Sequence, residues 1–129
     1  MTSSDAILIV EDDDGLREIL ARYLRHQGYP VTEAASAEDA VTAIQDGLRP
    51  ALVVLDINLP GDNGWDLLRG PSLAGAGDPP VVIASALPIS PKRLAEFRIA
   101  GYLPKPFPIE TLVDTVERVL SREEPQPEP

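Results

Sequence analysis

Residues 6–10 read AILIV, and the acidic residues Glu11–Asp14 (EDDD) follow them directly. A continuous apolar run of this length, with no polar residue alternating in it, is typical of a β-strand that is covered on both faces. A second run, Ala51–Leu55 (ALVVL), has the same character and is followed by Asp56. Strands of this kind belong to sheets with helices on both sides, so the two runs indicate an α/β domain.

The stretches between and after these runs alternate between helical spacing and further short apolar runs. Apolar residues recur at helical intervals from Leu16 to Leu24, from Ala40 to Leu48 and from Ile109 to Leu120. Further strands are predicted at Val31–Ala34, within Pro79–Ala84 and at Gly101–Leu103. Five strands that alternate with helices specify a parallel sheet, and Pro104 is tolerable if the last strand lies at the sheet edge.

Two of the predicted helices are short. A third helix can begin near Trp65, but Gly70-Pro71 should end it early. A fourth begins at Ser90-Pro91, where Ser caps the helix and Pro occupies its first position. After the last helix, residues 121–129 (SREEPQPEP) are polar and rich in Pro and Glu. We therefore expect a domain over residues 1–120 and a disordered tail or linker stub over residues 121–129.

Composition excludes several classes of protein. The chain has 129 residues, a length that suits one domain, and it has no cysteine, which excludes a disulfide scaffold and Cys-ligated metal sites. Its apolar runs are far shorter than the roughly 20 residues that span a bilayer, so no membrane contact is expected. The net charge of -10 argues against nucleic-acid binding by this domain, because phosphates would repel it.

Polar groups follow four of the predicted strands. They are the run Glu11–Asp14, then Asp56, Ser85 and Lys105. Because ligands of open parallel sheets bind beyond the carboxyl ends of the strands, these groups should share one site. Two carboxylates about 4 Å apart repel by roughly 4 kcal/mol at an effective dielectric near 20, so the acids need a raised pKa or a cation. Oxygen ligands without His or Cys favour Mg²⁺, to which Asn58 could add its backbone carbonyl.

Each feature taken alone also has an ordinary structural explanation. Acids in the first turn of a helix interact favourably with its dipole, and an Asp after a strand can cap a loop. Serine commonly ends strands, and a lone lysine is usually a surface residue. The combination is more informative, since a nucleophilic carboxylate, a metal, a hydroxyl donor and a cation together form a set that handles phosphoryl groups.

Four segments, in this order and spacing, resemble the receiver domain of response regulators in bacterial two-component signalling. They are ILIVEDD (Ile7–Asp13), LVVLDINLPGDNGWDLL (Leu52–Leu68), ASA (Ala84–Ala86) and GYLPKPF (Gly101–Phe107). The resemblance extends over about residues 5–120. It implies a flavodoxin-like, doubly wound sheet of five parallel strands in the order 2-1-3-4-5, flanked by helices.

The resemblance also implies a role for each site residue. Asp56 would accept a phosphoryl group, and Asp12, Asp56 and the backbone of Asn58 would bind Mg²⁺, with Glu11 in the outer shell. Ser85 and Lys105 would contact the phosphoryl group, and Ser85 would act with Tyr102 as the switch. The bond between Lys105 and Pro106 would be cis. The chain departs from the usual pattern in having Glu11 where Asp is commoner and apolar Leu87 two residues after Ser85.

The implied function is a phosphoacceptor switch, without turnover beyond its own phosphorylation and dephosphorylation. Its implied partners are a histidine kinase or phosphotransfer protein and an unidentified output protein or domain, in the cytoplasm. A monomer and a weak homodimer both remain open. Two alternatives are an interaction module that works without phosphorylation, suggested by the short helices, and an aspartyl-phosphate hydrolase. The hydrolase requires a second Asp two residues after the nucleophile, where this chain has Asn58.

Overall fold

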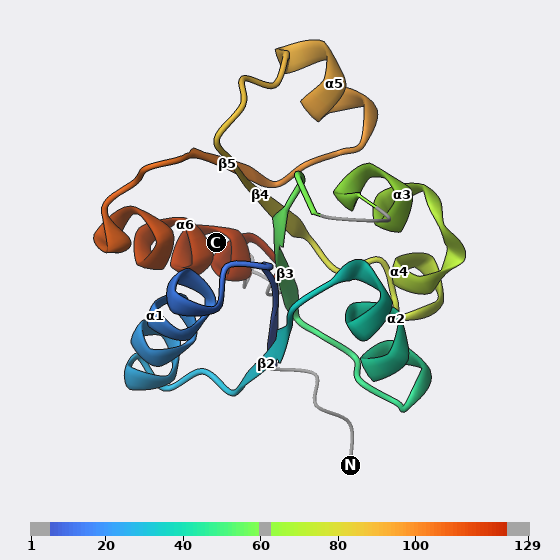
Figure 1. The fold of residues 1–129 in the computed structure, drawn as a ribbon, viewed down its shortest axis with the longest axis horizontal. Coiled ribbons are helices and arrows are strands. Elements are labelled where there is room, and N and C mark those ends of the chain that lie inside the picture. Colours follow the sequence, from blue (N-terminus) through green and yellow to red (C-terminus); the bar gives the residue numbers. More distant parts are fainter. Residues whose placement is uncertain (1–5, 60–62, 124–129) are drawn as a thin grey trace, which may run out of the picture.

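The centre of the fold is a five-stranded parallel sheet. A computed structural model describes residues 6–59 and 63–123 of the chain (Figure 1). The strands are β1 (Ile7–Val10), β2 (Val31–Ala34), β3 (Leu52–Asp56), β4 (Val81–Ser85) and β5 (Gly101–Pro104). Their order is β2-β1-β3-β4-β5, and all four neighbouring pairs are parallel. The predicted doubly wound order is therefore confirmed, and β5 with its Pro104 lies at an edge.

Helices cover both faces of this sheet. They are α1 (Asp14–His26), α2 (Ala37–Gln45), α3 (Gly64–Arg69), α4 (Pro71–Gly75), α5 (Pro91–Glu96) and α6 (Ile109–Glu123). Figure 1 shows α1 and α6 on one side of the strands and α2, α3 and α4 on the other, while α5 stands beyond β4 and β5. This arrangement places two helical layers against one sheet.

The apolar runs are buried on both faces, as the sequence indicates. Along β1, Ile7 and Ile9 pack with α1 and α6, in a cluster that includes Leu20 and Leu112. Leu8 and Val10 have the opposite orientation and belong to the other cluster, with residues of α2, α3 and α4. Successive side chains of a strand alternate between faces, so a strand that is apolar throughout serves two cores at once.

The middle of the chain differs from the prediction by one helix. Gly70 ends α3 as expected, but Pro71 then occupies the first turn of a further helix, α4. Proline is compatible with that position because its missing N–H has no partner within the helix there and its fixed φ suits the helix. The same Gly-Pro pair thus ends one helix and begins the next.

The last helix is longer than the predicted domain boundary allows. Whereas the sequence places the boundary at residue 120, α6 continues to Glu123. Helices usually end at or before the residue that precedes a proline, and Pro125 is the first proline after this helix begins. Residues 124–129 of the expected tail lie outside the described part of the chain.

The start of α3 lies close against the end of β3. Asn63 accepts a hydrogen bond from the backbone N–H of Asp66, and the Asp66 carboxylate accepts one from the N–H of Asn63, which makes a capping box. A Cβ at Gly64 would lie 2.8 Å from the Cα of Ile57, so a side chain at this position would displace backbone. The approach anchors the helix next to Asp56.

None of the helices in the described part of the chain combines the length and the hydropathy that crossing a bilayer requires.

Candidate functional site

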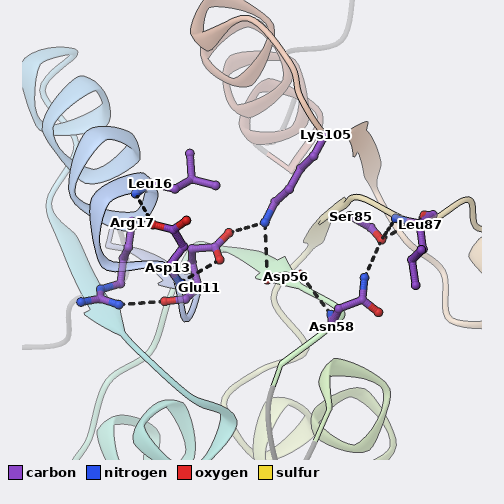
Figure 2. A network of polar contacts seen from close by, with 9 residues as sticks. All are labelled: Glu11, Asp13, Leu16, Arg17, Asp56, Asn58, Ser85, Leu87 and Lys105. Carbon is purple, nitrogen blue, oxygen red and sulfur yellow. Dashed lines mark hydrogen bonds and ion pairs between the residues drawn. The ribbon is translucent and has the colours of Figure 1, made fainter.

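The carboxyl ends of β1, β3, β4 and β5 bring the predicted site residues together. Figure 2 shows Glu11 after β1, Asp56 at the end of β3 and Ser85 at the end of β4, with Lys105 extending toward them from beyond β5. Parallel strands carry their carboxyl ends to the same edge of a sheet, which is why residues 94 positions apart, such as Glu11 and Lys105, can touch. This edge is the candidate site.

Asp56 occupies the centre of this edge. Its side chain is buried, with 7% of its surface exposed. One carboxylate oxygen, Oδ1, accepts a hydrogen bond of 3.0 Å from the backbone N–H of Asn58, and the other, Oδ2, lies 3.4 Å from the Lys105 Nζ. The loop and the lysine therefore fix the orientation of the carboxylate.

Three carboxylates meet here. Oxygen atoms of Glu11, Asp12 and Asp56 all lie within 4.8 Å of one another. Glu11 and Asp56 are buried, whereas Asp12 is exposed and leaves the cluster open to solvent on one side. Such a donor set, with oxygen ligands only and an excess of negative charge, suits a hard divalent cation such as Mg²⁺. The residues present thus fit the cation that the sequence predicts.

Lys105 contacts two of the three acids. Its Nζ donates a hydrogen bond of 2.6 Å to Oε1 of Glu11 and lies 3.4 Å from Asp56 Oδ2. Burial raises the pKa of Glu11 to about 7, although the hydrogen bond from Lys105 opposes this rise. Burial lowers the pKa of Lys105, but its contacts with Glu11 and Asp56 outweigh that effect and hold its pKa above the ordinary value. The lysine is therefore charged and closer to Glu11 than to Asp56.

The four-residue acidic run divides into two pairs. Glu11 and Asp12 belong to the cluster, whereas Asp13 is the N-cap of α1 and accepts a 3.0 Å hydrogen bond from the backbone N–H of Leu16. Asp14 lies in the first turn of α1, is 86% exposed, and pairs with Arg17 at 2.7 Å. Capping and the helix dipole thus explain the second pair, whereas the first pair belongs to the carboxylate cluster.

Ser85 uses its full hydrogen-bonding capacity. Its hydroxyl donates to the backbone carbonyl of Leu87 at 3.0 Å and accepts at 3.1 Å from both the Leu87 N–H and the Asn58 side-chain amide. The Tyr102 hydroxyl donates to the same Leu87 carbonyl, at 3.4 Å. Ser85 and Tyr102 are therefore linked by one shared acceptor, while the Leu87 side chain is 60% exposed.

The structure brings the expected residues to one edge of the sheet and adds two contacts that the sequence does not predict. The peptide bond between Lys105 and Pro106 is cis, as the resemblance implies. The side chain of Asn58, considered above only for its backbone, bonds to Ser85, and Arg17 donates to the carbonyl of Glu11 at 2.9 Å. A polar residue two positions after Asp56 was a usable signal for the first contact. Nothing in the sequence pointed to the second, since Arg17 belongs to an ordinary amphipathic helix.

Comparison with known proteins identifies the family. The profile of the response regulator receiver domain matches residues 7–117. The chain belongs to the receiver-domain family. Members of this family are the phosphoacceptor domains of two-component response regulators; they interact with histidine kinases and bind Mg²⁺ in an acidic pocket. As signalling phosphoacceptors, they are not enzymes in the usual sense.

Two curated relatives have similar sequences. The DNA-binding response regulator MtrA of Mycolicibacterium smegmatis is 36% identical over 127 residues, which cover 98% of this chain and 55% of the relative. The response regulator MprA of Mycobacterium tuberculosis is 35% identical over 123 residues, covering 93% of this chain and 52% of the relative. The chain thus spans about half the length of the curated relatives it matches.

Two solved structures have the same fold. The receiver domain of the hybrid histidine kinase CckA is 34% identical, with a TM-score of 0.73 over 89% of this chain and 98% of that one. The chemotaxis protein CheY4 of Vibrio cholerae is 26% identical, with a TM-score of 0.78 over 88% of this chain and 97% of that one. Both matches span nearly the whole of the other chain, so the likeness extends over the entire domain.

Proposed function

We propose that Asp56 is the phosphoacceptor of this receiver domain, and that a histidine kinase or a phosphotransfer protein is the donor. The observation that supports this most is the position of Asp56: a buried carboxylate at the end of a central strand, beside two further acids and a charged lysine. A carboxylate oxygen of Asp56 would attack the phosphorus of a phosphohistidine in line with the bond to the imidazole nitrogen. The P–N bond breaks as the P–O bond forms, and the imidazole leaves with the electron pair.

The surrounding residues bind the metal and balance charge in this reaction. Asp12, Asp56 and the backbone carbonyl of Asn58 would hold Mg²⁺, with Glu11 supporting it from the outer shell. When bound, the ion neutralises charge on the transferring phosphoryl group and on the attacking carboxylate. Lys105 provides a second positive charge: its Nζ, 2.6 Å from Glu11 Oε1, already lies 3.4 Å from Asp56 Oδ2 and would turn toward the phosphoryl oxygens.

We propose that Ser85 and Tyr102 carry the change in Asp56 to the surface. In order to donate to a phosphoryl oxygen, Ser85 must give up its hydrogen bond to the Leu87 carbonyl. That carbonyl is also the acceptor of Tyr102, so a rearrangement at Ser85 alters the environment of Tyr102 directly. Phosphorylation would then bias an equilibrium between two arrangements of the segment from Ser85 to Leu87 and of the edge strand β5.

The test is phosphorylation by acetyl phosphate in the presence of MgCl₂, followed by intact-mass spectrometry. Wild type should gain the mass of one phosphoryl group, in a linkage that is stable in acid and labile in base. Asp56→Asn should gain none, while Asp46→Asn, which changes an exposed Asp after α2, should label like wild type. Equal labelling of wild type and Asp56→Asn would show that the acceptor is another residue.

The alternative of an interaction module without phosphorylation is favoured by one observation, namely that α5 has no buried residue. A partner that recognises the receiver fold alone should bind with the same affinity before and after treatment with beryllofluoride, a stable mimic of the phosphoryl group. A phosphoryl switch should change that affinity.

The alternative of an aspartyl-phosphate hydrolase is weaker, because it needs a carboxylate at the position of Asn58. Turnover of p-nitrophenyl phosphate by the wild-type protein would support it.

The domain boundary and the output surface can be placed from the helices near the end of the chain. We propose that residues 6–123 fold and accept the phosphoryl group as one unit, independently of any segment that follows. The segment around α5, β5 and α6 would present the output surface to a partner protein or domain. A truncation at residue 123 that keeps the labelling rate of the full chain would support this boundary, whereas loss of labelling would show that residues 124–129 contribute.

A further inference from the structure

Arg17 is the only described arginine with a hydrogen bond to the loop that carries the acids of the site. It lies in the first turn of α1 and is held from three directions. Its Nη1 donates to the backbone carbonyl of Glu11 at 2.9 Å, its Nη2 to Asp14 at 2.7 Å, and its Nε lies 3.5 Å from Glu33 on β2 (Figure 2 shows the Glu11 contact). The side chain is only 16% exposed. One guanidinium therefore joins the loop after β1, the first turn of α1 and the neighbouring strand.

The contact to Glu11 has a counterpart at the other end of the same residue. The Glu11 carboxylate accepts a hydrogen bond from Lys105, and its backbone carbonyl accepts one from Arg17 (Figure 2). In the proposed function Lys105 leaves Glu11 for the phosphoryl group. Among the described contacts, Arg17 is then the one cationic side chain that still donates a hydrogen bond to Glu11.

We propose that Arg17 is a positioning residue for metal binding: the three contacts of its guanidinium (the guanidinium fork) hold the loop Glu11–Asp13 in place, so that the carboxylates of Glu11 and Asp12 stay oriented toward the Mg²⁺ site. The inference rests on the proposed metal site, and it deepens that proposal by assigning a residue that touches neither the metal ligands' carboxylates nor the phosphoryl group. A planar guanidinium suits the task because it donates in several fixed directions at once, which a lysine ammonium on a flexible stem does not.

Simple electrostatics predicts the opposite outcome, which makes the inference easy to test. Removing a positive charge near a cation site makes the site more negative and should strengthen Mg²⁺ binding. Removing a positioning residue should weaken it, because the ligands lose their arrangement; loss of an outer-shell partner typically costs 10–100-fold in metal affinity. The sign of the change therefore separates the two effects.

The experiment is a titration with MgCl₂, without any phosphoryl donor, followed by the amide chemical shifts of residues 11–13 and of Asn58 in ¹H–¹⁵N spectra. Three variants are compared with wild type: Arg17→Met, Arg17→Lys and Arg22→Met. The last is the matched control, since Arg22 lies on the same helix, is 76% exposed and pairs only with Glu18, at 3.5 Å, among the described contacts. Amide spectra recorded without metal verify that each variant is folded.

Arg17→Met should raise the dissociation constant for Mg²⁺ about tenfold. Arg17→Lys, which keeps the charge but loses the fork, should also raise it, and Arg22→Met should leave it within twofold of wild type. Affinity of Arg17→Met equal to or tighter than that of wild type would overturn the inference. If Arg17→Met does not fold, Arg17→Lys decides: wild-type affinity in that variant overturns it, and weaker affinity supports it.

The outcome is separable from that of the proposed function. If wild type is not labelled at Asp56 but Arg17→Met binds Mg²⁺ more weakly than wild type does, the phosphoacceptor assignment fails while the positioning role stands. If wild type is labelled and Arg17→Met binds Mg²⁺ unchanged, the positioning role fails alone. Wild type that binds no Mg²⁺ at these amides overturns the inference together with the metal site.

Discussion

The helices that precede and follow β5 differ in how much apolar surface they bury. The helix that follows the strand, α6, is 15 residues long and buries Leu112, Val116 and Val119 against the sheet. The helix that precedes it, α5, has six residues and none of them is buried. Burial of apolar surface is the main source of stability, so α6 belongs to the cooperative core while α5 is held only weakly.

The attachment of α5 depends on contacts with α3. Its Arg93 guanidinium lies 4.5 Å from the ring centroid of Trp65, and the Phe97 ring that follows α5 lies 5.1 Å from that of Trp65. Only Leu94 of the helix packs, half-buried, on the core. Aromatic and cation–π contacts of this kind contribute about 1 kcal/mol each. The acids of the site follow β1 and β3, whose residues are all buried, whereas Ser85 leads through the exposed residues 86–88 into a helix that can rearrange at low cost.

The largest expected effect is the loss of unfolding free energy when an apolar side chain of α6 or of α5 is truncated. Leu112→Ala should lower the free energy of unfolding by about 3 kcal/mol, because it leaves a cavity in a fully buried position. Leu94→Ala should lower it by about 1 kcal/mol, since that side chain is half exposed. Urea unfolding followed by far-UV circular dichroism measures both. Equal losses would mean that α5 belongs to the core after all.

A second effect concerns Glu11, which follows the buried strand β1. Its pKa rises from 4.5 to about 7 in the folded protein, so between these values the folded state holds a proton that the unfolded state has released. Its contribution to stability is full below about pH 4.5 and is lost as pH rises to and through 7, by on the order of 3 kcal/mol. Urea unfolding without Mg²⁺ at a series of pH values should show this decline as the difference between wild type and Glu11→Gln.

The control for this pH effect is Glu110→Gln, which changes an exposed carboxylate on α6. This variant removes one negative charge outside the buried cluster and so measures the effect of net charge alone. A Glu11→Gln profile that matches that of this control would mean that Glu11 titrates alike in the folded and unfolded states.

The third effect tests whether α5 unfolds by itself. Ser90 caps this helix by accepting a 3.2 Å hydrogen bond from the Arg93 N–H, and Ser90→Ala should cost about 1 kcal/mol. Because α5 buries little, the loss should appear as faster amide hydrogen exchange in residues 93–97 while exchange in α6 stays unchanged. Ser36→Ala, which removes the corresponding cap of α2, is the matched variant. Faster exchange in α6 with Ser90→Ala would contradict local unfolding.

The smallest effect is that of the cation–π contact. Arg93→Ala should lower stability by about 0.5–1 kcal/mol and change the emission of Trp65, whose ring it uncovers. Lys92→Ala removes an exposed charge from the neighbouring position and should change neither. Identical Trp65 emission in Arg93→Ala and wild type would show that the guanidinium does not rest on the ring in solution.

This contrast also explains how much the sequence could reveal. The apolar runs, such as Ile7–Val10, predict the sheet because a strand buried on two faces leaves a simple pattern. Strand ends then locate Glu11, Asp56, Ser85 and Lys105, since parallel topology brings them to one edge. The pattern depends only on which residues are apolar and where runs end, and both can be read along the chain.

Contacts that depend on side-chain reach could not be predicted in this way. The fork of Arg17 joins residues from β1, α1 and β2, and the Asn58 amide reaches Ser85 across 27 positions. The additional helix α4 leaves no clear sequence signal, because Pro71 is compatible both with the end of one helix and with the first turn of the next. Likewise, the short polar segment after Leu120 gave no apolar signal for the last turn of α6, because a solvated helix end needs none.

The carbonyl of Leu87 has a consequence for the sensitivity of the switch. An oxygen with two lone pairs currently serves both Ser85 and Tyr102. If the Ser85 hydroxyl donates its hydrogen bond to a phosphoryl oxygen instead of to the Leu87 carbonyl, it still donates one hydrogen bond. Water or Tyr102 can then donate to the Leu87 carbonyl. In the unmodified protein the hydroxyl has no phosphoryl oxygen to donate to, and its oxygen also accepts from Asn58 and from the Leu87 N–H, so the rearranged state should be a minor one before phosphorylation. To make a state populated at about 1% dominant, phosphorylation would have to favour it by about 5.5 kcal/mol.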